Sequence, residues 1–206
     1  MLFENGFSLD RFRISQFSNP PSILLRNGIS SFSELRFSFC SIPQSYELNC
    51  LFENTVNRVF TLGYKHKLLK EDKLLPETAI MVNYSANYLL QQFKGSTIET
   101  YLLLHHNISD KFGFNSNIGF FHITHSASDF LFVSACVNYN FHHRLGAFVE
   151  SFNYFSGKSG SMENAFDAGI TFMINHKIQF DISCIMNQNS AKKFISSYAL
   201  GFSFQL

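Results

Sequence analysis

The amino-acid sequence predicts an all-β protein, a transmembrane antiparallel up-and-down β-barrel of about twelve strands that forms one domain over residues 1–206. Three observations lead to this prediction. Large apolar residues alternate with small or polar ones, and a short polar turn recurs at a fixed spacing. Charged residues make up only 15% of the chain, whereas soluble domains have roughly 25%.

The composition narrows the classes of function. The formal net charge is +1, which argues against a nucleic-acid partner because phosphate binding needs a clustered basic surplus. No Pro-, Gly- or Ser-rich linker divides the chain, so a single domain is expected. No uncharged apolar run reaches the roughly 18 residues of a membrane-spanning helix, and no signal peptide is visible at the N-terminus.

The alternation is clearest at the end of the chain. The large apolar residues of this segment are Tyr198, Leu200, Phe202, Phe204 and Leu206, and the positions between them are Ser, Ala, Gly or Gln. Residues 129–141, 164–174 and 178–187 behave in the same way. Successive side chains of a strand point to opposite faces, so each segment has one apolar and one polar face.

The turn repeat joins these strands into hairpins. The sequences ISDKF, FHHRL and INHKI begin at Ile108, Phe141 and Ile174, a spacing of 33 residues. Each is a polar turn between two apolar residues, and a shorter relative occupies 29–32. A repeating unit of strand, tight turn, strand and longer loop is a β-meander.

The whole chain can be divided on this pattern. The predicted strands are 2–12, 20–27, 33–40, 56–67, 77–88, 97–108, 112–123, 129–141, 145–156, 164–174, 178–187 and 196–206. Most are long enough to cross a membrane at a tilt of roughly 45°. Short turns at one rim, longer Ser- and Asn-rich loops at the other and both termini on the periplasmic side are typical of bacterial barrels.

Alternation alone also fits a soluble sandwich or a soluble ligand-binding barrel. Two features favour the membrane. The polar face carries Gly, Ser, Asn, Asp and Glu on strand after strand, which suits a wet lumen, and the strands exceed the usual five or six residues of soluble sheets.

Several motifs, taken in order, resemble a known family. They are PSILLRNGI at 21–29, ELR at 34–36, NIG at 117–119, VE at 149–150, DAG at 167–169, QFDIS at 179–183 and GFSF at 201–204. Together they resemble a bacterial outer-membrane transporter family labelled as a putative MetA-pathway of phenol degradation protein. The resemblance implies a barrel in outer-membrane lipid that moves hydrophobic or aromatic small molecules. It also implies insertion by the barrel-assembly machinery and an N-terminal leader that precedes residue 1.

Charged side chains on the polar face are the candidate lumen-lining residues. They are Arg26, Glu34, Arg36, Lys65, Lys67, Glu99, Glu150, Asp167 and Asp181. One interpretation is a charge-lined passage that selects permeants. The other is a set of interior ion pairs that fills and stiffens a narrow barrel.

No cofactor, metal site or catalytic residue is predicted. Adjacent histidines on a strand point to opposite faces, so the pair at 105–106 cannot hold one metal ion. Cys40 and Cys50 flank a polar segment, where a disulfide is possible in an oxidising compartment.

Two other functions remain open. One is a structural or partner-binding barrel that uses the loop 41–55. The other is a barrel lipid hydrolase, for which His125 and Ser126 are the candidates although adjacent residues form a poor nucleophile and base pair.

Overall fold

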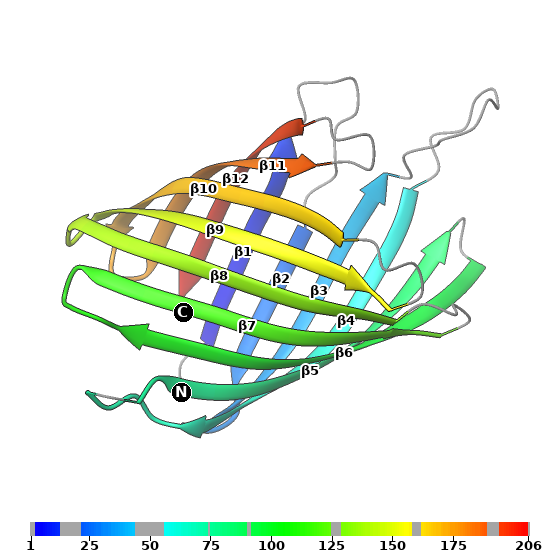
Figure 1. The fold of residues 1–206 in the computed structure, drawn as a ribbon, viewed down its shortest axis with the longest axis horizontal. Coiled ribbons are helices and arrows are strands. Elements are labelled where there is room, and N and C mark those ends of the chain that lie inside the picture. The colour runs from blue at the N-terminus through cyan, green and yellow to red at the C-terminus, as the bar shows by residue number, and fades with distance from the viewer. Residues whose placement is uncertain are drawn as a thin grey trace.

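The computed structural model of the chain describes residues 3–12, 22–43, 56–73, 75–89, 92–124, 129–157, 162–188 and 194–205. These residues form twelve strands (Figure 1). They are β1 (Phe3–Phe12), β2 (Ser22–Gly28), β3 (Ser33–Pro43), β4 (Val56–Leu69), β5 (Glu77–Leu89), β6 (Gln92–Asn107), β7 (Phe112–Ile123), β8 (Asp129–His142), β9 (Leu145–Ser156), β10 (Met162–Asn175), β11 (Ile178–Gln188) and β12 (Phe194–Gln205).

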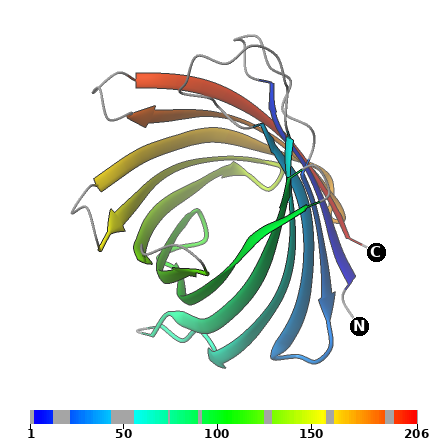
Figure 2. The same cartoon turned by 90° about the vertical axis from the view of Figure 1, so that its right-hand side faces the viewer.

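The strands form a closed antiparallel barrel. Each strand pairs with the next along the chain, and β12 returns to pair with β1. Figure 2 shows the strands curving around a common interior. Closure leaves no unpaired sheet edge, which a strand in lipid could not tolerate. The predicted fold class, an up-and-down barrel of about twelve strands, is therefore confirmed.

Each predicted strand is present, and the main difference lies at the start of β6. This strand begins at Gln92 instead of 97, so the expected loop 89–96 is much shorter. The pairing of β5 with β6 shifts register after Asn87, and Gly95 has a φ of 138°. Only glycine adopts this backbone conformation readily, and it lets the hairpin continue past the irregularity.

Exposure alternates along the strands with the apolar side outward. In β7, Ile118 and Phe120 are 49% and 47% exposed, whereas Asn117, which precedes Ile118, and its partner Ser134 in β8 face inward. Exposed Leu, Ile, Val, Phe or Tyr side chains also lie on the outside of β2 to β6 and of β8 to β12. An apolar exterior around a polar interior is the reverse of a soluble protein, and it requires an apolar solvent.

The two rims of the barrel differ. The connections 29–32, 70–76, 108–111, 143–144 and 176–177 lie at the rim where β1 begins and β12 ends. Three of them correspond to the predicted turn repeat.

In the described part of the chain, no helix is long and apolar enough to span a membrane.

Candidate channel lumen

Inward-facing side chains are aligned in rows by the strand register. One row runs from Arg26 in β2 through Arg36, Gly63 and Asn83 to Glu99 in β6. Strands of this barrel therefore bring charges from distant parts of the sequence to one level of the lumen. The predicted lumen residues lie on this inward face: one group on β2 and β3, two lysines on β4, Glu99 on β6 and a second group on β9 to β11.

The first group lies on β2 and β3 and forms a compact ion-paired cluster. Arg26 donates from Nε and Nη2 to the two carboxylate oxygens of Glu34, at 2.9 and 2.8 Å. Arg36 Nε lies 3.6 Å from the same carboxylate, and Arg36 Nη1 lies 3.2 Å from Met81 Sδ of β5. A two-pronged guanidinium contact fixes the carboxylate geometry as well as its charge.

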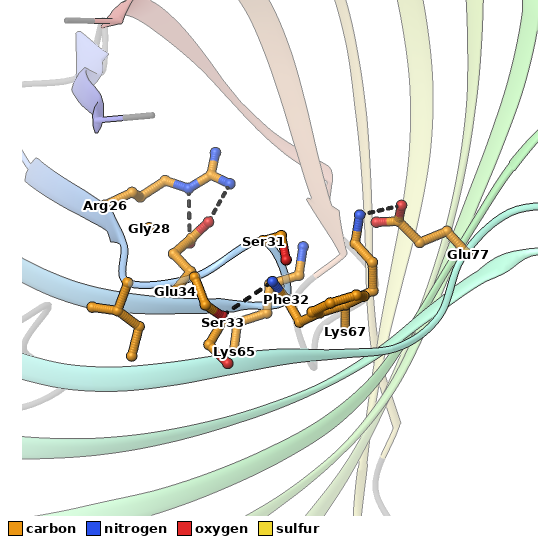
Figure 3. A pocket seen from close by; sticks show the side chains of 11 residues that line it. Arg26, Gly28, Ser31, Phe32, Ser33, Glu34, Lys65, Lys67 and Glu77 are labelled. Atoms are coloured by element: carbon orange, nitrogen blue, oxygen red, sulfur yellow. Dashed lines mark hydrogen bonds and ion pairs between the residues drawn. The ribbon is translucent and has the colours of Figure 1, made fainter. Parts of the chain in front are cut away.

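A cavity of about 690 Å³ lies beside this cluster at the short-turn rim (Figure 3). Lys65 and Lys67 of β4 and Glu77 of β5 line its other side. Lys67 Nζ lies 2.6 Å from Glu77 Oε2, so these two side chains form a direct ion pair. The cavity is thus bordered by three cationic and two anionic side chains from β2 to β5.

A second cavity, of about 300 Å³, shares Lys65 and Glu77 with the first. It extends along β6, β7 and β8 to Glu150 in β9. Shared lining residues make the two cavities neighbouring parts of one lumen. Its polar walls, with Asn115 and Asn117 among them, suit water and dissolved polar molecules.

Glu99 of β6 ends the row of inward residues that begins at Arg26. Its Oε2 accepts hydrogen bonds from Asn83 Nδ2 at 3.0 Å and from the Tyr101 hydroxyl at 2.9 Å. The carboxylate is therefore held by two neutral donors instead of a cation. This arrangement fixes the Tyr101 ring on the inner wall.

Tyr101 belongs to a cluster of four inward-facing rings on β6 to β9. Its ring meets those of Phe121 and Phe132 edge to face, with centroids 5.5 and 6.0 Å away. Tyr154 completes the cluster, 5.0 Å from Phe132 and 6.0 Å from Phe121. Edge-to-face aromatic pairs of this kind each add about 0.5–1.5 kcal/mol to the burial of the rings.

Sequence analysis missed this ring cluster. The alternation was recognised from the inward Asn and Ser residues, whose strands also place Phe121 and Phe132 inward. The doublet Phe120–Phe121 was the available signal, because two adjacent aromatic residues on a strand must occupy opposite faces.

The second group of predicted residues is acidic and lies on β9 to β11. Glu150 and Asp167 are directly opposite each other in neighbouring strands, and Asp181 lies opposite Gly201. Ser134 hydrogen-bonds Glu150, and Ser183 Oγ donates to Asp167 at 3.4 Å. Positions alone do not show selection of permeants, so that role stays a prediction.

The predicted sites for other chemistry have different outcomes. His125, Ser126, Cys50 and residues 44–55 lie outside the described residues, so the hydrolase pair, the disulfide and the binding loop stay predictions. Within the described ranges, no three His, Cys, Asp or Glu side chains gather as a metal site would require.

A different serine and histidine meet on the outside of the barrel, near the short-turn rim. Ser33 Oγ lies 2.8 Å from His66 Nδ1, and the Tyr64 hydroxyl lies 3.0 Å from Ser33 Oγ. A catalytic pair also needs a group that orients the base. No carboxylate among the described residues forms an ion pair with His66, so this cluster does not complete a hydrolase site.

Comparison with solved structures identifies the fold. The NanC porin matches with a TM-score of 0.65 and 10% sequence identity, over 100% of this chain and 99% of that one. The KdgM porin matches with a TM-score of 0.62 and 8% identity, over 99% and 98%. This is the fold of outer-membrane porins.

A third similar structure is an outer membrane channel from Pseudomonas putida F1, with a TM-score of 0.59 and 8% identity, over 99% of this chain and 92% of that one. At such identities the likeness concerns the fold alone. No protein-family model and no curated protein matches the sequence. Membership of the transporter family of phenol degradation therefore stays a prediction.

Proposed function

We propose that this chain is a passive outer-membrane channel for small molecules, and that molecules with an aromatic or apolar part are among its permeants. The observation that carries this proposal is the inverted distribution of polarity. Large apolar side chains cover the outside, while charged and amide side chains line cavities inside. A barrel of this kind is stable in lipid and presents a wet interior.

The internal cavities favour a channel over a purely structural barrel. A barrel filled by its own side chains would leave no room near its axis. Here cavities of about 690 and 300 Å³ adjoin at Lys65 and Glu77. Their combined lining extends from Arg26 in β2 to Glu150 in β9, so the space crosses much of the lumen.

The ring cluster supports the second part of the proposal. Tyr154 is 38% exposed, so part of its ring is available to a passing molecule. Aromatic solutes gain stacking energy on such a surface. The resemblance of the sequence to an outer-membrane transporter family of phenol degradation supports the same class of solute.

The channel is tested with protein refolded in detergent and checked by a heat-modifiable band on a denaturing gel. In planar bilayers we expect stepwise ion conductance, and in liposomes we expect swelling in methyl β-D-glucoside. A heat-modifiable, β-rich protein that gives neither conductance nor swelling would contradict the proposal.

The aromatic preference needs a solute pair that differs by one ring. Methyl and phenyl β-D-glucoside are both uncharged and cross lipid poorly. We expect phenyl glucoside to block the ion current for longer, and Tyr154→Leu to shorten that block roughly threefold, the weight of one aromatic pair. Phe120→Leu, on the outer face, is the matched control and should leave the block unchanged. Equal blocks by both glucosides would remove aromatic solutes from the proposal.

A further inference from the structure

The smaller cavity has opposite charges at its two sides. Its volume is about 300 Å³, and its lining includes Lys65 of β4 at one side and Glu150 of β9 at the other. Between them lie the side chains of Ala79, Leu103 and Asn117. A space of this size is at the lower end of the range of small-molecule sites.

Lys65 contributes a cation that the surrounding carboxylates do not neutralise by contact. Glu34 is already held by the two arginines of β2 and β3, and Glu77 by Lys67. In the described part of the chain, no carboxylate lies within ion-pair distance of the Lys65 ammonium. Its charge is therefore available to a carboxylate of a solute.

Glu150 contributes the opposite charge under similar conditions. Its described hydrogen-bond donor is the neutral hydroxyl of Ser134, which in turn accepts from Asn117 Nδ2 at 2.8 Å. Among the side chains that the structure describes in β6 to β11, none that faces inward is a Lys or Arg. A solute ammonium group would therefore be the missing counterion.

We propose that this cavity is a transient binding site for small zwitterions of the amino-acid type, with the solute carboxylate at Lys65 and its ammonium group at Glu150. The proposal deepens the channel function and rests on it. A molecule with both charges satisfies both ends of the cavity at once. A singly charged molecule leaves the other end without a counterion, and an uncharged one satisfies neither.

The remaining lining residues fit the same class of solute. His105 Nδ1 already forms a hydrogen bond with Asn115 Oδ1 at 2.6 Å, so this wall is preformed. Ala79 and Leu103 supply an apolar patch against which a short side chain can lie. The volume limits the solute to a small amino acid.

The test measures the swelling of liposomes that contain the folded channel, in threonine and in erythritol. The two solutes have similar size and no net charge, and both cross lipid poorly, but only threonine is a zwitterion. The variants are Lys65→Met and Glu150→Gln, each of which removes one charge and little volume. The matched control is Asp181→Asn, which removes a charge from the inward face at a position that does not line this cavity.

We expect threonine to enter faster than erythritol in the unaltered channel. Each of Lys65→Met and Glu150→Gln should lower the threonine-to-erythritol ratio roughly three- to fivefold, the weight of one water-exposed ion pair. Asp181→Asn should leave the ratio unchanged. Far-UV circular dichroism and the heat-modifiable band show whether each variant is folded.

Three results would overturn the proposal. An unchanged ratio in both variants, with erythritol still entering, would reject the zwitterion site and leave the channel function intact. A fall in Lys65→Met alone would make the cavity an anion site. No entry of either solute into liposomes with the folded, unaltered protein would reject the channel itself and the site with it.

Discussion

The inner surface of this barrel is built in two different ways on its two sides. Along β2 to β5 it carries the charged cluster of Arg26, Glu34 and their neighbours, and the larger cavity lies beside it. Along β6 to β9 it carries the four-ring cluster with Tyr101 at its start. The charged side holds its side chains by ion pairs and leaves space, whereas the aromatic side fills space by packing.

The difference follows from the backbone that each side offers. Long cationic side chains reach along the wall to carboxylates on neighbouring strands, and they remain partly hydrated: Arg26 and Glu34 are 31% and 19% exposed. Rings need a flat surface close to the backbone. Gly119 of β7 provides one directly beneath Tyr101, which lies against it.

The largest expected effect comes from filling that surface. A Cβ atom added at Gly119 would lie 2.7 Å from Cδ1 of Tyr101, which is closer than carbon atoms can approach. Gly119→Ala should therefore displace the ring and destabilise the folded barrel by about 1–3 kcal/mol, as overpacking does. Urea-induced unfolding in detergent measures the loss. It is followed by far-UV circular dichroism, because the chain contains no tryptophan for fluorescence.

Gly113→Ala in the same strand is the matched control. Its added Cβ would have no neighbour closer than 3.6 Å, the Asn138 side-chain nitrogen. We expect this variant to unfold at nearly the same urea concentration as the unaltered protein. Equal losses of stability in the two variants would mean that the replacement of glycine in a strand, and not the contact with the Tyr101 ring, causes the loss.

A smaller effect is expected on the charged side. Arg26→Ala removes both hydrogen bonds to Glu34 and leaves that carboxylate with Arg36 Nε at 3.6 Å. Because both partners are partly hydrated, the loss should be about 1 kcal/mol. It should shrink when salt is added, since mobile ions screen exposed charges.

Arg26→Lys tests whether geometry or charge stabilises this cluster. Lysine keeps the positive charge and cannot reproduce the two-pronged contact. We expect about half of the alanine effect in the same unfolding measurement. A salt-independent loss in Arg26→Ala would contradict the view that the charged side is hydrated.

The fold could be predicted because a strand in lipid has a simple sequence rule. One face of each strand must be apolar along its whole length, so the alternation around Phe202 marks both the strand and the face that meets lipid. The turn repeat at Ile108, Phe141 and Ile174 then fixes the hairpins. Only details that depend on one glycine escape this rule, such as the early start of β6 at Gln92, which depends on the positive φ of Gly95.

The lumen could be predicted only as a list of residues. Sequence periodicity shows that Lys65 and Glu150 point inward, but their place at opposite ends of one cavity depends on the register of five intervening strand pairs. The ring cluster was missed for a related reason. Rings on the inner face contradict the simple rule of a polar interior. The inward position of Phe132 is explained by its contacts with the rings of Tyr101 and Tyr154, which only the structure shows.

The smallest expected effect concerns the short-turn rim, where the connection between β4 and β5 on the charged side contacts the end of β6. Glu71 of this connection accepts hydrogen bonds from the backbone N–H of Asn107 and, at 2.7 Å, from its Nδ2, and His106 Nδ1 lies 3.3 Å from the same carboxylate. These hydrogen bonds, with the neighbouring histidines His105 and His106, lower the pKa of Glu71 below its ordinary value of 4.5.

A carboxyl group with a lowered pKa in the folded state stabilises that state above its ordinary pKa and loses this contribution as the pH falls through the lowered value. Exchange of the Asn107 amide hydrogen should therefore be slow near neutral pH. On acidification it should become faster than the intrinsic pH dependence of exchange predicts. Glu71→Gln keeps a hydrogen-bond acceptor without a titrating charge, so this variant should follow the intrinsic dependence throughout. If the unaltered protein behaved like Glu71→Gln, the carboxylate would not hold the charged side of the barrel to β6, and the two sides would be joined at this rim by backbone pairing alone.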